Sequence, residues 1–268
     1  MQPPSMMTIP TPAAVIDLER LVRNTSRMSE RAHGLGVRLR PHVKTHKCTE
    51  AARYQVEGHF GGITVSTLAE AERFADSGFQ DITYAVPLAP GRARRAAAVG
   101  RRLASFQVIV DHPEAVSALV EAVEVEDATL GVLIKVDCGY GRAGLRPDDP
   151  RLTELAGLIA RAPGVDFRGV LVHGGHSYDC VGRDAILEVA EAERAEAVRA
   201  AERIRAVGIA VDVVSVGSTP TAMVVEDLTG VTELRPGNYT LFDMFQASIG
   251  SCAVEDVALS VVTEVIGV

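Results

Sequence analysis

Strand-like and helix-like segments alternate along this chain, and this alternation restricts its fold more than any other feature. The strand-like segments are short and rich in β-branched residues, and they cover residues 37–44, 61–66, 81–86, 105–110, 129–137, 167–173, 211–216 and 232–235. Segments with apolar residues at helical spacing precede or separate them, at residues 18–35, 49–59, 68–77, 91–102, 113–125, 151–161 and 184–207. This order predicts an α/β fold, a (β/α)8 TIM barrel. An open doubly wound sheet is the alternative, and the absence of a Gly-x-Gly-x-x-Gly loop disfavours it.

Length and composition agree with one large barrel. The chain has 268 residues, of which 47% are hydrophobic, and barrels of this kind have typically about 250 residues. The net charge of −8 argues against nucleic acid as a partner. No run of about 18 apolar residues is present, so no membrane span and no membrane partner are predicted.

The cysteines and the N-terminal segment indicate a compartment. Residues 1–12 contain neither the basic nor the apolar region of a secretory signal, and the four cysteines are far apart without a Cys-x-x-Cys pair. We therefore expect a cytoplasmic protein with free thiols.

The last segment of the chain does not fit a closed barrel. Residues 257–268 have the composition of a ninth strand, for which an eight-stranded barrel has no place. We therefore expect residues 1–250 to form the barrel. Residues 251–268 would be the first strand of an otherwise absent C-terminal β domain.

The first predicted strand ends in two residues suited to chemistry. Its residues alternate, so that His42 and Lys44 share one face and lie at the carboxyl-terminal mouth of the barrel. Partial desolvation lowers the pKa of such a lysine and frees an amine for carbonyl chemistry. The alternative is a solvated lysine beside a loop.

Two further strand ends add charged and aromatic side chains. After the fifth strand, Lys135 and Asp137 are expected to form a buried ion pair, and the following glycines place Arg142 over the mouth. After the sixth strand, His173 and His176 are three residues apart. With Asp179 they could bind a metal, but we favour hydrogen bonding to a cofactor or substrate.

The ends of strands seven and eight have the composition of an anion site. Ser218 and Thr219 precede a predicted helix, and Gly237 and Asn238 follow the last strand. Hydroxyl groups and backbone N–H groups in this position suit a phosphate. A phosphate there and a carbonyl at Lys44 describe a phosphorylated aldehyde, of which pyridoxal phosphate is an example.

These motifs, taken in order, resemble those of the fold-type III pyridoxal-phosphate enzymes, the alanine-racemase-like barrels. Within them the chain is similar to the D-threonine aldolase and D-serine dehydratase family. The motifs are Pro41 to Lys47, Lys135 to Gly144, His173 to Tyr178, Gly217 to Pro220 and Arg235 to Tyr239.

The resemblance implies that Lys44 is the Schiff-base lysine and that Arg142 lies near the ring hydroxyl of the cofactor. The full set of candidate cofactor-binding residues is His42, Arg142, His176, Tyr178, Ser218, Thr219, Gly237, Asn238 and Tyr239. The family also implies a homodimer and a divalent metal, zinc or manganese. Its ligands lie in the C-terminal β domain and are missing here, so no metal ligand is assigned to this chain.

The leading hypothesis is a pyridoxal-phosphate-dependent carbon–carbon or carbon–oxygen lyase acting on D-β-hydroxy amino acids. D-threonine aldolase and D-serine or D-threonine dehydratase chemistry both remain open. A non-catalytic pyridoxal-phosphate-binding barrel that handles the cofactor is the alternative. A metal-dependent hydrolase barrel that uses His173, His176 and Asp179 is less favoured.

Overall fold

Eight parallel strands form the centre of the molecule. The computed structural model describes residues 9–267. The sheet contains β2 (Arg38–Leu39), β3 (Ile63–Val65), β4 (Asp81–Pro87), β5 (Ser105–Val110), β6 (Leu130–Lys135), β7 (Val165–Leu171), β8 (Val213–Val216) and β9 (Glu233–Leu234), in the order β2-β9-β8-β7-β6-β5-β4-β3. A parallel bridge between His42 and Thr64 joins the segment after β2 to β3. There the backbone N–H of Thr64 donates to the Pro41 carbonyl at 2.8 Å. The barrel prediction is confirmed.

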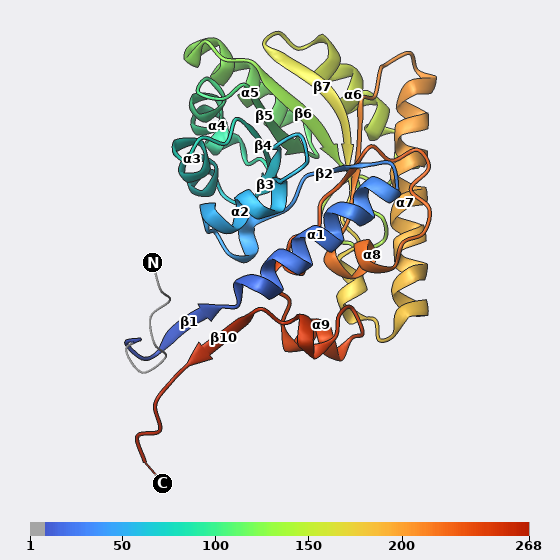
Figure 1. Cartoon of the computed structure of the whole chain (residues 1–268). Coiled ribbons are helices and arrows are strands. Elements are labelled where there is room, and N and C mark those ends of the chain that lie inside the picture. The colour runs from blue at the N-terminus through green and yellow to red at the C-terminus, as the bar shows by residue number, and fades with distance from the viewer. Residues whose placement is uncertain (1–8, 268) are drawn as a thin grey trace.

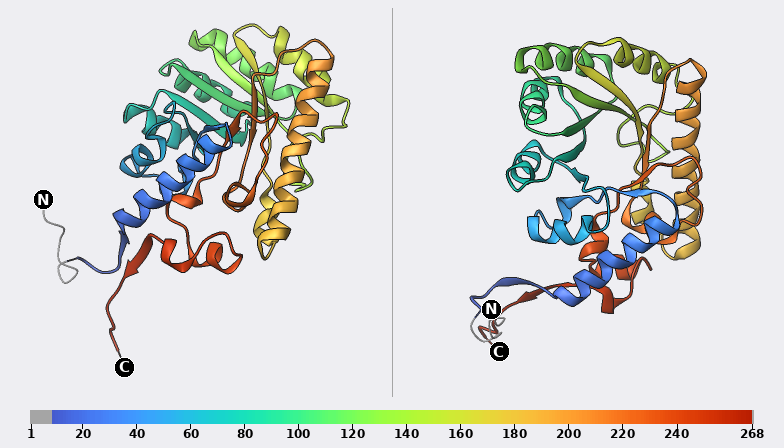
Figure 2. Two further views of the ribbon diagram at one scale, coloured as in Figure 1. Left: turned by 45° about the vertical axis from the view of Figure 1, so that its right-hand side comes forward. Right: turned by 45° about the horizontal axis from the view of Figure 1, so that its top comes forward.

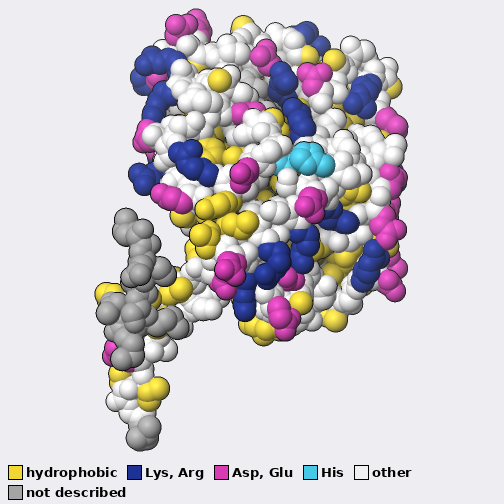
Figure 3. All heavy atoms as spheres, in the orientation of Figure 1, with side chains coloured by type: hydrophobic (Ala, Val, Ile, Leu, Met, Phe, Trp, Pro, Cys, Tyr) yellow, Lys and Arg dark blue, Asp and Glu magenta, His cyan; other side chains and the backbone are white. Residues whose placement is uncertain are grey.

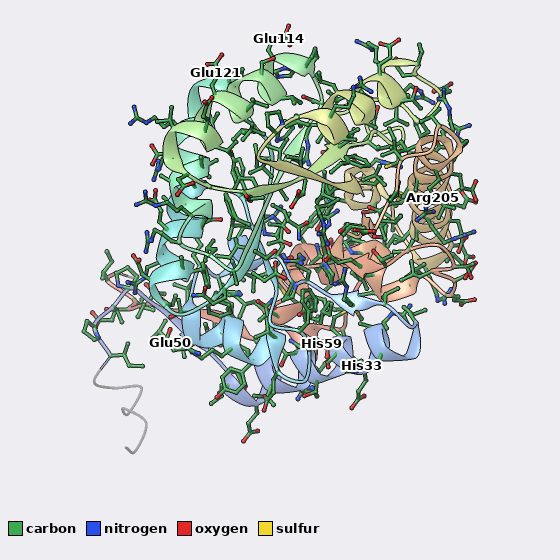
Figure 4. All side chains as sticks on the ribbon, turned by 90° about the horizontal axis from the view of Figure 1, so that it is seen from above. His33, Glu50, His59, Glu114, Glu121 and Arg205 are labelled. Carbon is green, nitrogen blue, oxygen red and sulfur yellow. The ribbon has the colours of Figure 1, made fainter. Side chains whose placement is uncertain are left out.

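Helices cover the outside of the strands (Figures 1 and 2). They are α1 (Leu18–Gly34), α2 (Thr49–Val56), α3 (Leu68–Asp76), α4 (Ala93–Gly100), α5 (Pro113–Glu126), α6 (Arg151–Arg161), α7 (Arg183–Ala206), α8 (Thr219–Val224) and α9 (Met244–Ser248). Several begin at a side-chain cap, as where Thr67 accepts a hydrogen bond from the backbone N–H of Glu70 at the start of α3. The outer faces of the helices are polar. Glu114 and Glu121 on α5, for example, point away from the barrel (Figure 4).

The alternation of side chains along each strand divides the core into two layers. On β6, Val132 and Ile134 face the helices and belong to the large outer core. Leu133, between them, belongs to a small inner cluster with Ile109, Leu171 and Val213. This inward and outward alternation is expected of a closed barrel, whose interior is filled by side chains.

A charged cluster fills the opposite end of the interior, away from the carboxyl ends of the strands. Arg40 is 1% exposed, and its guanidinium contacts Glu233 and Asp81, each at 2.6 Å. Phe60 packs on the same guanidinium, 4.8 Å from ring centre to Cζ. Buried charges are tolerated when they are paired and hydrogen-bonded in this way, and removing one partner leaves an uncompensated charge.

A two-stranded antiparallel sheet extends from the barrel (Figure 1). It pairs β1 (Ala13–Ile16) with β10 (Leu259–Val262). The strand expected over 257–268 is therefore present but shorter, and its partner β1 was not expected. Its assignment to a second domain stays a prediction, as do the homodimer and the cytoplasmic location.

Acidic and basic side chains are interspersed over the visible face of the barrel (Figure 3). None of the helices in residues 9–267 combines the length and the apolar character needed to span a membrane.

Candidate active site

A cavity lies where the carboxyl ends of the strands meet, and most of the predicted site residues line it. These are His42, Lys44, Arg142, Tyr178, Ser218, Thr219, Gly237 and Asn238. They come from segments that follow five different strands, β2, β6, β7, β8 and β9. The fold thus brings together residues that are almost 200 positions apart in the sequence.

The turn that carries Lys44 differs from the predicted strand. Backbone hydrogen bonds to β9 and the residues after it continue as far as His42, whose N–H donates to the Pro236 carbonyl at 2.9 Å. Val43–Thr45 then form a short 3-10 helix. The backbone N–H of Lys44 donates to Nδ1 of His42 at 3.4 Å. The prediction of an extended strand to residue 44 was therefore wrong, because the backbone bonds of this turn replace a ladder. His42 and Lys44 nevertheless line the same cavity.

Burial and neighbouring cations make the cavity chemically unusual. Burial, and then Arg142 and Arg235, lower the pKa of Lys44, as the sequence interpretation expected. Burial also lowers the pKa of Lys135 to about 8 and that of Arg235 to about 10. Burial and the nearby cations hold the pKa of His173 well below its usual value.

The lining carries an excess of positive charge. Lys44, Lys135, Arg142 and Arg235 all contribute to the wall, and no Asp or Glu does among the described residues. Such a cavity favours anionic ligands.

The expected ion pair between Lys135 and Asp137 is absent from residues 9–267. Nζ of Lys135 donates to the Val136 carbonyl at 2.6 Å. The Asp137 carboxylate instead accepts hydrogen bonds from the backbone N–H groups of Gly139 and Gly141, at 3.1 and 2.9 Å. The prediction was wrong because two backbone donors in the glycine turn compete successfully for the carboxylate.

The anion site expected after strands β8 and β9 has free donors. In the described part of the chain, the backbone N–H groups of Gly237 and Asn238 have no hydrogen-bond partner. A Cβ at Gly237 would lie 2.5 Å from the His42 carbonyl, so only glycine permits this close approach. These donors fit the phosphate of pyridoxal phosphate.

Two of the hydroxyl groups near this site have different roles. Oγ of Ser218 accepts from the backbone N–H of Thr221 at 3.2 Å and lies 2.8 Å from Oγ of Ser177. It therefore caps α8 and has little capacity left for a ligand. Tyr178 and Thr219 both line the cavity, and burial raises the pKa of Tyr178 while hydrogen bonding with Thr219 opposes the rise.

Two predicted residues lie outside the lining. His176 packs with its ring centre 6.0 Å from that of Tyr140. Tyr239 is 1% exposed, and its backbone N–H donates to Oγ1 of Thr219 at 3.2 Å. Tyr239 thus supports the lining residue Thr219 from behind.

Lys135 and Arg235 line the cavity but were not among the predicted cofactor-binding residues, whereas His173, for which hydrogen bonding to a cofactor or substrate was favoured, lines it as well. Arg235 is oriented by hydrogen bonds to Oγ of Ser215, at 2.6 Å, and to the Val172 carbonyl. Its position directly after a strand was the available signal.

The metal alternative finds no ligand set. Within residues 9–267, no three His, Cys, Asp or Glu side chains gather closely enough to hold a metal ion. His173, His176 and Asp179 therefore do not form the cluster that the hydrolase hypothesis requires, and the divalent metal of the family has no site among the described residues.

Comparison with known proteins identifies the family. The model of "Alanine racemase, N-terminal domain" matches residues 16–244. The chain is similar to D-threo-3-hydroxyaspartate dehydratase of Delftia sp. (strain HT23), with 46% identity over 263 residues, 98% of this chain and 69% of that protein. It is 35% identical to D-serine dehydratase of Dictyostelium discoideum over 96% of this chain and 69% of that protein. It is 34% identical to D-threonine aldolase of Arthrobacter sp. over 88% of this chain and 62% of that protein.

The fold comparison agrees with these matches. The solved structure of the Delftia sp. HT23 enzyme superposes with a TM-score of 0.92 at 45% identity, covering 97% of this chain and 68% of that one. The chain therefore belongs to the alanine racemase N-terminal domain family of fold-type III pyridoxal-phosphate enzymes.

Proposed function

We propose that this chain is a pyridoxal-phosphate-dependent lyase that acts on D-β-hydroxy amino acids. One observation carries the proposal. The Lys44 amine, whose pKa is lowered, lines the same cavity as the unpaired backbone donors of Gly237 and Asn238. An amine and a phosphate site that share one small cavity suit a ligand with an aldehyde at one end and a phosphate at the other.

The residues divide the work of holding such a ligand. The N–H groups of Gly237 and Asn238, with the hydroxyls of Tyr178 and Thr219, would bind the phosphate. Lys44 would hold the aldehyde carbon, and Arg142 the ring hydroxyl. When bound, pyridoxal phosphate condenses with an amine and withdraws electrons from the substrate Cα.

Lys44 has a second role once the substrate amine has taken its place. A lowered pKa increases the neutral fraction of its Nζ, which can then accept the proton from Cα. Loss of the β-hydroxyl as water, followed by hydrolysis, yields a keto acid and ammonia. Breaking the Cα–Cβ bond instead yields glycine and an aldehyde. The dehydratase relatives at 46% and 35% identity support the first outcome.

A product assay tests the proposal. The chain is incubated with pyridoxal phosphate and with D-threo-3-hydroxyaspartate, D-serine or D-threonine, with and without added zinc or manganese. We expect keto acid and ammonia from at least one D substrate and none from the L enantiomers or from the Lys44→Ala variant. Equal product from Lys44→Ala would contradict the role of this lysine. Cofactor binding without any product would favour the non-catalytic barrel.

A further inference from the structure

A buried carboxylate stands behind the cavity wall and has no part in the chemistry described so far. Glu193 lies on α7, the long helix that packs beside α8 on the outside of the barrel (Figure 1). It is 2% exposed, although a glutamate is almost never fully buried unless it is paired. The burial of this carboxylate therefore has to be explained by the groups around it.

Three donors from two loops converge on this carboxylate. Oε1 of Glu193 accepts from the backbone N–H of Gly174 at 2.6 Å and from that of Gly217 at 3.1 Å. Oε2 accepts from Oγ1 of Thr221 at 3.0 Å. Gly174 follows β7, whereas Gly217 and Thr221 follow β8. One side chain thus ties together the ends of two neighbouring strands.

The set of partners calls for a carboxylate in particular. An ionised carboxylate only accepts hydrogen bonds, and here both of its oxygens accept; a glutamine would keep the two backbone N–H groups only by turning its NH₂ toward Thr221, whose hydroxyl would then have to accept instead of donate. Buried charge is tolerated when hydrogen bonds and opposite charges compensate it. Here the negative charge of Glu193 also raises the pKa of Lys135 and of Arg235 against the effect of burial, so it lies close enough to balance part of the positive charge of the cavity.

The two loops that Glu193 holds carry residues of the cofactor site. His173 and Tyr178 lie in the segment after β7, and Thr219 is the first residue of α8, directly after the turn that follows β8. A second contact, 2.8 Å between Oγ of Ser177 and Oγ of Ser218, joins the same loops. The distance between Tyr178 and Thr219, the two hydroxyls at the phosphate end of the cavity, therefore depends on how these loops are fixed.

We infer that Glu193 is a positioning residue that holds the loops after β7 and β8 in the arrangement that binds the cofactor phosphate. The inference rests on the proposed function only in naming pyridoxal phosphate as the ligand. A site fixed before the ligand arrives binds more tightly, because binding does not have to order the loops.

Glu193→Gln is the direct test, and Thr221→Val is the second variant, which removes the hydroxyl that donates to Glu193 and that also accepts from the Ser218 backbone N–H. Ala201→Gly serves as the control, because Ala201 is buried on the same helix about two turns away and touches neither loop. Two properties are measured on the whole chain. One is amide hydrogen exchange of residues 173–179 and 217–221 without cofactor, and the other is the dissociation constant for pyridoxal phosphate.

For Glu193→Gln we expect exchange in both loops to become about tenfold faster and the affinity for pyridoxal phosphate to fall by about tenfold, as for the loss of one charged hydrogen bond. Thr221→Val is expected to change the exchange rate and the affinity in the same directions, but by less. The control is expected to lower the melting temperature while its affinity stays within about twofold of wild type.

Unchanged exchange in both loops of Glu193→Gln, or of Thr221→Val if the first variant does not fold, would overturn the inference. So would an equal loss of affinity in the Ala201→Gly control. If the wild-type chain binds no pyridoxal phosphate, the proposed function fails. The exchange measurement, which needs no cofactor, then still decides whether Glu193 positions the loops.

Discussion

Replacing Lys135 by methionine is expected to stabilise the cofactor-free protein at neutral pH. Lys135 is 5% exposed, and its Nζ makes a single hydrogen bond, to the Val136 carbonyl. Burial lowers its pKa from 10.5 to about 8. Methionine has a similar length and carries no charge, so it can occupy the same space without the cost of burying an ammonium group.

The size of the effect follows from proton linkage. Between pH 8 and 10.5 the unfolded chain holds a proton on Lys135 that the folded chain has lost, so stability rises with pH in this window. Below pH 8 Lys135 is charged in both states, so the full free-energy cost of burying its ammonium group applies. This cost follows from the difference between the two pKa values and is about 3 kcal/mol. Losing the hydrogen bond to Val136 costs about 1 kcal/mol, which leaves a net gain of about 2 kcal/mol at pH 7.

Urea unfolding at several pH values between 7 and 10.5 measures this effect as the difference in unfolding free energy between variant and wild type. We expect the difference to be largest at pH 7, to fall as the pH rises, and to reverse in favour of the wild type toward pH 10.5, where only the cost of the lost hydrogen bond remains. A Lys135→Met variant that is less stable at pH 7, or a difference that does not vary with pH, would refute the reasoning.

Two other substitutions test the interior and the phosphate end. Arg40→Met leaves Glu233 buried without its 2.6 Å partner, so unfolding in urea should show a loss of about 3–5 kcal/mol, partly restored in the double variant Arg40→Met/Glu233→Leu. A loss below about 1 kcal/mol would contradict this. Gly237→Ala places a Cβ 2.5 Å from the His42 carbonyl and should weaken pyridoxal phosphate binding in a titration, whereas Gly91→Ala, where the space is open, should not.

The parts of the fold that depend on local pattern were predictable from the sequence. Ser105–Val110 is a strand with the bounds expected from its β-branched run, and Arg151–Arg161 is a helix with the bounds expected from its apolar spacing. The pairing of β1 with β10 was not predictable, because Ala13 and Val262 meet only through the folding of everything between them.

In the candidate site, too, features set by local sequence were predictable, whereas those set by contacts between distant segments were not. Lys44, Thr219 and Gly237 were found because each follows a strand in a recognisable motif. The ion pair expected for Lys135 failed because the nearby Asp137 binds backbone N–H groups instead, a choice that spacing along the strand does not reveal. Glu193 is one of several glutamates on α7, and its partners lie in other loops. Only the three-dimensional structure distinguishes it.

The labelling of a single lysine tests the account most directly. The chain has only three lysines, Lys44, Lys47 and Lys135, so borohydride reduction in the presence of pyridoxal phosphate, followed by peptide mass spectrometry, identifies the one that binds the cofactor. We predict a reduced pyridoxyl adduct on Lys44 that is absent from the Lys44→Ala variant. An adduct confined to Lys47 or Lys135, or an unlabelled wild-type chain, would contradict the central claim.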